Sequence, residues 1–387
     1  MPTIMNQKND DFLTMTREEL ACFRLRTLYS NYGYSQYKMS KFEEYDLYVR
    51  NKNFLISDNV ITFTDHSGHL LALKPDVTLS IVKNGRDVPG AVSRIYYNEN
   101  VYRTAPGSRD FREINQVGLE CIGELDTYLL SEVLTLAVKS LKMASLIISG
   151  LHHAPDYLLE VSHLDVVSCM LDSLSVSAEV KTELLTCIGE KNVHDMARIC
   201  REAGVDEARA LSLQTLVTTY GTPDEVLPVL SSLAGENAAL RGPVEELSHT
   251  LAALPAEVKD RVRLDFSLLN DMSYYNGIVF RGYIKGIPDG VLSGGRYDRL
   301  MRKMDRRSDA LGFAVYLDRL AGYYTSAPDE LAYETVLLYD DETDLSALTE
   351  AVAERARKNE RTVAVRSLPN TWLAGEVIDM RGGKRDE

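Results

Sequence analysis

The sequence predicts an α+β fold in which long strands pair with their neighbours in an antiparallel sheet. Residues 92–103 and 112–122 alternate apolar and polar side chains, and a short loop joins them, as in two paired strands. Residues 175–258 are rich in alanine, leucine and glutamate, which predicts an inserted helical module. With 387 residues, the chain is long enough for two or three domains.

The N-terminal part predicts a helix followed by a hairpin. We expect a helix over residues 16–31, because Thr16 and Glu19 have the spacing of a capping box. Gly33 then predicts the turn that ends this helix. Residues 59–76 predict a β-hairpin, since two β-rich segments flank a turn that contains a Ser-Gly pair.

Further elements are predicted towards the C-terminus. Asp126 predicts the N-cap of another helix, because apolar residues follow it at helical spacing. Beyond the helical module, we expect strands over 261–267 and 275–284. A linker-like Ser-Ala-Pro segment then separates a core domain, residues 1–325, from a small α/β domain of βαβ type, residues 330–387.

Net charge, hydropathy and cysteine distribution indicate what kind of protein this is and what it binds. The chain carries a formal net charge of −14, whereas proteins that bind nucleic acid usually present a basic face. We therefore expect small-molecule and protein partners rather than nucleic acid. No segment is apolar enough to span a bilayer, and the first residues lack the apolar core of a signal peptide. Five scattered cysteines without a CxxC pair suit a reducing compartment, so we expect a cytoplasmic protein.

The sequence contains none of the common cofactor and hydrolase motifs. There is no Walker loop, no GxSxG, no HExxH and no GxGxxG after a strand, so we expect no cofactor. His152, His153 and His163 raise the question of a metal site. Adjacent histidines on an extended segment point in opposite directions, and no cysteine or carboxylate completes a recognisable spacing. We therefore expect structural or solvent-exposed histidines and no metal.

One strand predicts a polar cavity. Gln116, Gly118 and Glu120 share one face of the second long strand, because side chains alternate along a strand. Burial of such a face is costly unless its polar groups find partners, so it is expected to line a cavity in which Gly118 leaves room for a ligand. The alternative is that this face of the hairpin is exposed to solvent.

Five sequence blocks occur in a characteristic order: LALKPDVT, then VYR…REINQVGLECIG, YYNGIVF, SGGRYDRL and LGFAVYLDRL. Together they resemble the catalytic core of histidyl-tRNA synthetase and, more closely, its paralogue, the regulatory subunit of ATP phosphoribosyltransferase. The resemblance covers residues 1–325. It implies a class II aminoacyl-tRNA synthetase-like fold, with an antiparallel sheet flanked by helices. It also implies a homodimer within a larger hetero-oligomer.

The resemblance further implies that the cavity binds histidine. It assigns Asp76 and Thr78 to the amino group of histidine, Gln116 and Glu120 to its polar groups, and Tyr275 and Tyr297 to the imidazole. These residue types suit the ligand, because each buried donor or acceptor needs a partner. Alternatives remain open for two residues: Asp76 caps a helix that starts near Val77, or Tyr275 is an ordinary core residue.

The chain departs from a synthetase where the nucleotide would bind. Asn270 stands where the synthetase has an arginine, Ala105 replaces an acidic residue, and Tyr316 replaces a small glycine. Adenylate formation needs cations beside the α-phosphate, so these changes argue against catalysis. Arg103 and Arg319 are either a remnant of the anion site or members of ion pairs.

The resemblance therefore implies a histidine-sensing regulatory subunit that is not itself an enzyme. Its expected partner is the short catalytic subunit of ATP phosphoribosyltransferase. Residues after 328 are too few for a full anticodon-binding domain, which agrees with this expectation. The alternatives are a divergent, active histidyl-tRNA synthetase and an RNA-binding module built on the synthetase fold.

Overall fold

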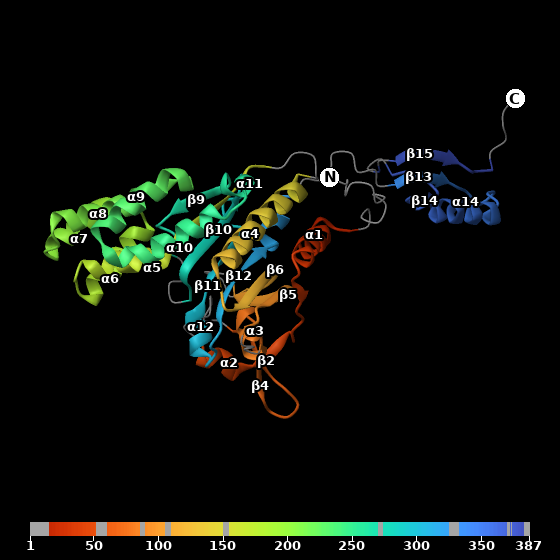
Figure 1. Cartoon of the computed structure of the whole chain (residues 1–387). Helices are drawn as coiled ribbons and strands as arrows, with labels where there is room; N and C mark the ends of the chain where they lie inside the picture. Colours follow the sequence, from red (N-terminus) through yellow and green to blue (C-terminus); the bar gives the residue numbers. More distant parts are fainter. Residues whose placement is uncertain are drawn as a thin grey trace. The chain divides into compact units, whose positions relative to one another are not determined.

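Nine strands form one sheet in the larger of the two units into which the chain divides (Figure 1). The larger unit is Thr16–Tyr324, and the smaller contains the chain from Thr325 onward. The structure is a computed structural model. It describes residues 15–51, 60–85, 90–104, 110–149, 155–269, 274–324, 333–369, 372 and 374–382.

The large sheet is mixed, with an antiparallel centre. Its strands, in spatial order, are β1 (Ser35–Gln36), β5 (Ser93–Thr104), β6 (Phe111–Gly123), β12 (Asp309–Tyr316), β11 (Leu292–Arg296), β10 (Asn276–Ile284), β7 (Tyr157–His163), β9 (Val262–Asp265) and β8 (Tyr220–Gly221). Every pair from β5 to β7 is antiparallel, whereas β1 pairs with β5, and β7 with β9, in parallel. The predicted antiparallel pairing of the two long strands, β5 and β6, is confirmed.

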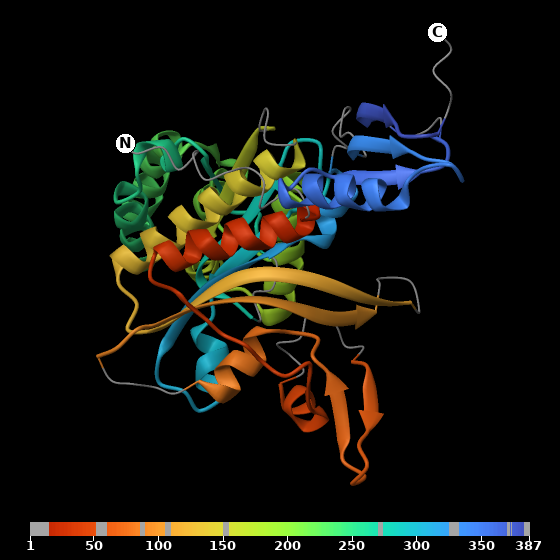
Figure 2. The same cartoon turned by 90° about the vertical axis from the view of Figure 1, so that its right-hand side faces the viewer.

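Two helices, α1 (Arg17–Asn31) and α4 (Thr127–Ile148), lie side by side over one face of this sheet (Figure 2). Both begin at the predicted caps. Thr16 accepts a hydrogen bond from the backbone N of Glu19 at 3.2 Å, and the Glu19 carboxylate accepts one from the backbone N of Thr16 at 2.8 Å. Asp126 caps α4 by accepting a hydrogen bond from the backbone N of Leu129 at 2.8 Å. These caps satisfy backbone donors that the helices cannot pair internally.

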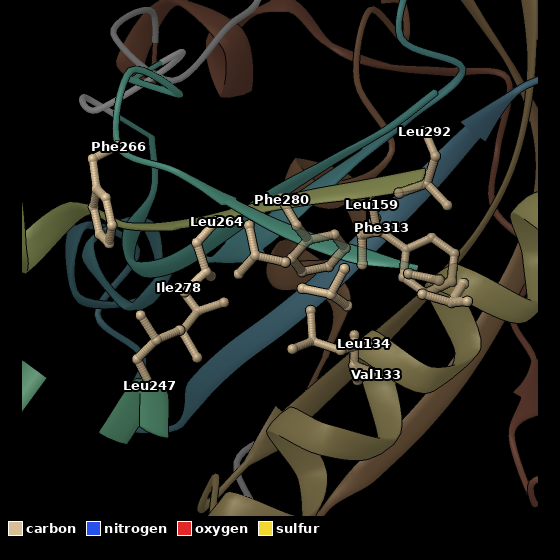
Figure 3. Packing of buried hydrophobic residues seen from close by; sticks show 14 of the residues in the cluster. Val133, Leu134, Leu159, Leu247, Leu264, Phe266, Ile278, Phe280, Leu292 and Phe313 are labelled. Carbon is tan, nitrogen blue, oxygen red and sulfur yellow. The ribbon is translucent and has the colours of Figure 1, made fainter. Parts of the chain in front are cut away.

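The main core lies between α4 and the sheet. Val133 and Leu134 of α4 face Phe280 and Phe313 of the central strands (Figure 3), and all four side chains are buried. Phe280 and Phe313 meet edge to face, with ring centroids 6.2 Å apart. Burial of each such side chain contributes about 1.5–3 kcal/mol, so this layer holds α4 on the sheet.

Helices fill most of the predicted helical module. They are α6 (Ala178–Gly189), α7 (Val193–Glu202), α8 (Glu207–Thr218), α9 (Pro223–Glu236), α10 (Arg241–Ala252) and α11 (Ala256–Lys259). They follow α5 (Leu164–Ser173), and the short strand β8 interrupts them. Leu247 of α10 packs near Ile278 of β10 (Figure 3), so the module shares the main core.

A small second sheet, in the order β2-β4-β3, contains the predicted hairpin. Its elements and neighbouring helices are β2 (Phe42–Glu44), α2 (Tyr45–Arg50), β3 (Thr62–Thr64), β4 (Leu70–Leu73) and α3 (Thr78–Asn84). Gly68 makes the turn with a φ of +84°, a conformation that favours glycine. Beyond β4, the fully buried ammonium of Lys74 pairs with the Glu99 carboxylate at 2.5 Å.

The smaller unit is a parallel α/β sheet. Its elements are β13 (Tyr333–Leu338), α14 (Leu345–Arg357), β14 (Thr362–Val365) and β15 (Ala374–Asp379), with strand order β14-β13-β15. The βαβ pattern was predicted, and β15 is an additional strand parallel to β13. Nowhere in the described residues is a helix both long and apolar enough to cross a membrane.

Candidate ligand pocket on the central sheet

All six residues expected to bind a ligand line one pocket on the central sheet. They are Asp76, Thr78, Gln116, Glu120, Tyr275 and Tyr297. The pocket also takes Tyr97, Arg103, Tyr274, Ser293, Tyr316 and parts of β12. These residues come from the start of α3 and the residues just before it, from neighbouring strands, from the segment that precedes β10 and from the end of β11, so residues far apart in the sequence converge there.

Strand register explains why Gln116 and Glu120 point into the pocket. On β12, Tyr316 lies opposite Gln116 and Gly312 lies opposite Glu120, so all four positions share one face of the sheet. Gln116 and Glu120 are 4% and 2% exposed. The alternative of a solvent-exposed hairpin face is therefore wrong.

Two hydrogen bonds hold Glu120 within the pocket. Its carboxyl accepts hydrogen bonds from the Thr78 hydroxyl at 3.0 Å and from the Tyr297 hydroxyl at 2.7 Å. A Cβ at Gly312 would lie 1.7 Å from Oε2 of Glu120, so only glycine leaves room for this carboxyl. Burial raises the pKa of Glu120 to about 8, although the two hydrogen bonds oppose the rise.

Asp76 both caps a helix and lines the pocket. Its Oδ1 accepts a hydrogen bond from the backbone N of Leu79 at 2.9 Å, in the first turn of α3. The capping alternative is thus correct, but it does not remove Asp76 from the pocket. Burial raises the pKa of Asp76, and the nearby Arg103 guanidinium opposes this rise.

Gly118 does not leave room for a ligand, contrary to the expectation from the sequence. Tyr97 lies directly opposite on β5, and a Cβ at Gly118 would lie 2.5 Å from the Tyr97 hydroxyl. The glycine therefore makes space for a tyrosine of the protein itself. Tyr97 then lines the pocket between the two polar side chains of β6.

Tyrosine rings form one wall of the pocket. Tyr274 lies 4.6 Å from Tyr275 and 5.9 Å from Tyr297, measured between ring centroids. A Cβ at Gly295 would lie 2.8 Å from Cδ1 of Tyr275, so the second glycine of the SGGRYD block admits this ring. Tyr275 is partly buried in a small cluster with Val279, yet it also lines the pocket.

The two arginines differ in their surroundings. Arg103 lines the pocket, and its Nε donates to the backbone carbonyl of Pro75 at 2.7 Å. Arg319 stacks over the Tyr316 ring, with its guanidinium carbon 4.4 Å from the centroid, and donates to the carbonyl of Gly290. The Tyr316 hydroxyl shares a hydrogen bond of 2.7 Å with Ser293. Arg319 therefore holds Tyr316, whereas Arg103 faces the pocket.

The chemistry of the pocket suits a small molecule with both charges. Asp76 and Glu120 can meet a cation, Arg103 can meet an anion, and the hydroxyls can pair with ring nitrogens. The cavity volume is about 40 Å³, room for a few water molecules. Among the described residues, no cluster of histidine, cysteine or carboxylate side chains could hold a metal ion.

Several residues discussed from the sequence lie outside the part of the chain that the structure describes. Asn270, Ala105, His152 and His153 lie outside the described residues, as does the Ser-Ala-Pro segment. His163 is described, and its ring is 2% exposed and bonded to Glu246, in agreement with a structural role.

Pocket residues missed from the sequence are Tyr97, Tyr274 and Ser293. Tyr97 could have been found from strand alternation, since it lies six residues before Arg103 on the same face of β5. Tyr274 adjoins Tyr275 in the YYNG block. Ser293 carries no comparable signal, because its place depends on the pairing of β11 with β12.

Comparison with known proteins gives the family that this chain resembles along most of its length. The family model of histidyl-tRNA synthetase matches residues 13–320. An ATP phosphoribosyltransferase regulatory subunit of Oceanobacillus iheyensis is 24% identical over 345 residues, which cover 88% of this chain and 82% of that protein.

Two solved structures share the fold. The first, described as an ATP phosphoribosyltransferase regulatory subunit/histidyl-tRNA synthetase from Bacillus halodurans, has a TM-score of 0.74 at 22% identity and covers 99% of this chain and 100% of that chain. A chain of an ATP phosphoribosyltransferase complex from Thermotoga maritima has a TM-score of 0.53 at 16% identity, with coverage of 81% and 98%. The class II synthetase-like fold expected from the sequence is thereby confirmed.

Proposed function

The chain belongs to the histidyl-tRNA synthetase family, and from that premise we propose that it is a non-catalytic regulatory subunit of ATP phosphoribosyltransferase that senses histidine. Relatives that carry the regulatory-subunit name match most of its length, which supports the role. Histidine is the end product of the pathway that this enzyme begins, so a histidine pocket on its partner subunit provides feedback.

The observation that carries the proposal is the convergence of the six expected histidine-binding residues in one buried pocket. In this proposal, Asp76 meets the ammonium of histidine. Arg103 carries the charge that the carboxylate needs, and Glu120 with Tyr297 can pair with the ring nitrogens. A cationic or N–H group beside Glu120 lowers the pKa of that carboxyl, so histidine binding is expected to release a proton near neutral pH.

The nucleotide side of the pocket supports sensing rather than activation. Tyr316 is held by Ser293 on one side and by the stacked Arg319 on the other. Adenylate formation needs space and cations beside the carboxylate of the amino acid. The second candidate is an active histidyl-tRNA synthetase, which the match to that family favours. An active synthetase would catalyse histidine-dependent pyrophosphate exchange. Salt-dependent transfer-RNA binding would instead favour an RNA-binding module.

The partner in this proposal is the short catalytic subunit of ATP phosphoribosyltransferase. One of the structures that share this fold comes from a complex of that enzyme, which supports the choice. Histidine can inhibit such a complex only if it binds the low-activity state more tightly than the active one. Coupling of this kind is typically worth about 1–3 kcal/mol.

The test is phosphoribosyl transfer by the cognate short catalytic subunit, measured with and without this chain across a histidine titration. We expect activation by the chain and inhibition by histidine. Glu120→Ala should shift the inhibition to higher histidine concentration, and Glu124→Ala, at an exposed position four residues further on, serves as the control. Identical activity with and without the chain would refute the proposal.

A further inference from the structure

Glu246 of α10 connects the helical module to the strand that leads into the pocket. One carboxylate oxygen of Glu246 lies 3.4 Å from Nη1 of Arg296, the last residue of β11. The next residue along the chain is Tyr297, whose hydroxyl donates to Glu120 inside the pocket. The path from the module to the pocket therefore consists of one ion pair, one peptide bond and one hydrogen bond.

Arg296 is held by carboxylates from three elements. Its Nε lies 2.6 Å from Asp298 in α12 (Asp298–Lys303), and its Nη2 lies 3.1 Å from Asp309 at the start of β12. Its side chain is 19% exposed, so these contacts are partly shielded from solvent. Of the three carboxylates, Glu246 belongs to the helical module. Its loss would leave Arg296 paired within the core but detached from the module.

The second carboxylate oxygen of Glu246 contacts His163, so both oxygens of this side chain have partners. It lies 3.2 Å from Nε2 of His163, whose ring is 2% exposed. This hydrogen bond lowers the pKa of Glu246, against the opposing effect of burial, so the charge persists at neutral pH. Gly277 has a φ of +60°, and a Cβ there would lie 3.3 Å from Cδ of Arg296. The glycine lets the ion pair approach the start of β10 closely.

A ligand in the pocket acts on the hydrogen bond between Tyr297 and Glu120, because both side chains line the cavity. Polar groups of a ligand that pair with either side chain compete with this hydrogen bond of 2.7 Å, so binding shifts the position of Tyr297 or of Glu120. A displacement of Tyr297 also acts on the adjacent Arg296.

We infer that Glu246 is a positioning residue of the pocket, through which the helical module sets the affinity for histidine. This inference rests on the proposed function, since it concerns the regulation of the same pocket. Coupling is reciprocal: if the module strengthens histidine binding through Glu246, then bound histidine stabilises the attachment of α10 by the same factor. The stability of the attachment of α10 therefore depends on whether histidine occupies the pocket.

The test is calorimetric titration of the full chain with histidine, together with amide hydrogen exchange of α10. Glu246→Gln keeps the size of the side chain and removes its charge, and it is expected to weaken histidine binding by about tenfold, within the usual range of coupling. Glu245→Gln, at the exposed neighbouring position, should bind like the wild type. Histidine should slow exchange in α10 of the wild type but not of Glu246→Gln.

A second variant separates positioning from general loosening. Leu247→Ala weakens the packing of α10 without touching the ion pair, so it should lower thermal stability and leave histidine affinity unchanged while the protein is folded. Equal losses of affinity in Leu247→Ala and Glu246→Gln would overturn the inference, as would wild-type affinity in Glu246→Gln. A wild-type chain that fails to bind histidine would instead overturn the proposed function.

Discussion

The buried carboxyl of Glu120 makes the stability of the larger unit depend on pH. In the unfolded chain this carboxyl loses its proton near its ordinary pKa of 4.5, whereas in the folded pocket it keeps the proton up to a pKa of about 8. Between these values the unfolded state binds fewer protons than the folded state, so the free energy of unfolding falls as the pH rises. Glu120→Gln removes this dependence and retains the shape of the side chain.

The size of the effect follows from the shift. Each unit of pKa corresponds to about 1.4 kcal/mol, so the full shift from 4.5 to about 8 is worth about 5 kcal/mol. Between pH 5 and pH 8, Glu120→Gln should gain about 3–4 kcal/mol relative to the wild type. Below pH 4 both states of the wild type are protonated at this position, and the difference between the two proteins should be constant.

Urea denaturation at several pH values measures this difference, without ligand and at constant ionic strength. Far-UV circular dichroism is the suitable signal, because the single tryptophan, Trp372, lies in the smaller unit and does not report on the pocket. Glu124→Gln provides the control for loss of an exposed carboxylate. Wild type and Glu120→Gln curves that run parallel from pH 5 to pH 8 would refute the reasoning.

Three further substitutions test other parts of the structure. Gly312→Ala should lower histidine affinity at least about tenfold in calorimetry, because the new Cβ displaces the Glu120 carboxyl and also pushes against the backbone carbonyl of Leu119. Unchanged affinity would contradict the pocket geometry. Lys74→Met leaves Glu99 without its partner and should cost about 3–5 kcal/mol in urea denaturation, with much of the loss recovered by adding Glu99→Leu. Thr16→Ala removes the capping box and should lower the free energy of unfolding by about 1 kcal/mol in the same assay. An unchanged free energy of unfolding would show that the cap does not stabilise α1.

Local patterns in the sequence predicted much of the fold. The capping box at Thr16, the cap at Asp126 and the two long strands each depend on residues close together in the chain, and each is confirmed. The parallel pairs of β1 with β5 and of β7 with β9 were not predicted. Such partners are separated by long stretches of chain, and only tertiary packing brings them together.

Some features of the pocket could likewise be predicted from neighbouring residues in the sequence, whereas others depend on strand pairing. Glu120 and Gln116 were expected on one face from alternation alone, and the other candidates came from the order of the blocks. The role of Gly118 was misjudged, because it depends on the register that places Tyr97 opposite it. Register between strands is set by the whole sheet, so no pattern within β6 could reveal it.

The contact between Gly312 and Glu120 also constrains how the sequence can diverge. A Cβ at position 312 would lie 1.7 Å from the Glu120 carboxyl and 2.5 Å from the backbone carbonyl oxygen of Leu119, so a side chain there fits only after both the carboxyl and the backbone of β6 have moved. We therefore expect descendants that lose Glu120 to keep glycine at position 312, because the contact with the Leu119 carbonyl oxygen remains. A single reversion to glutamate at position 120 then restores the pocket. Loss of this carboxyl is reversible in a lineage for as long as glycine persists at position 312.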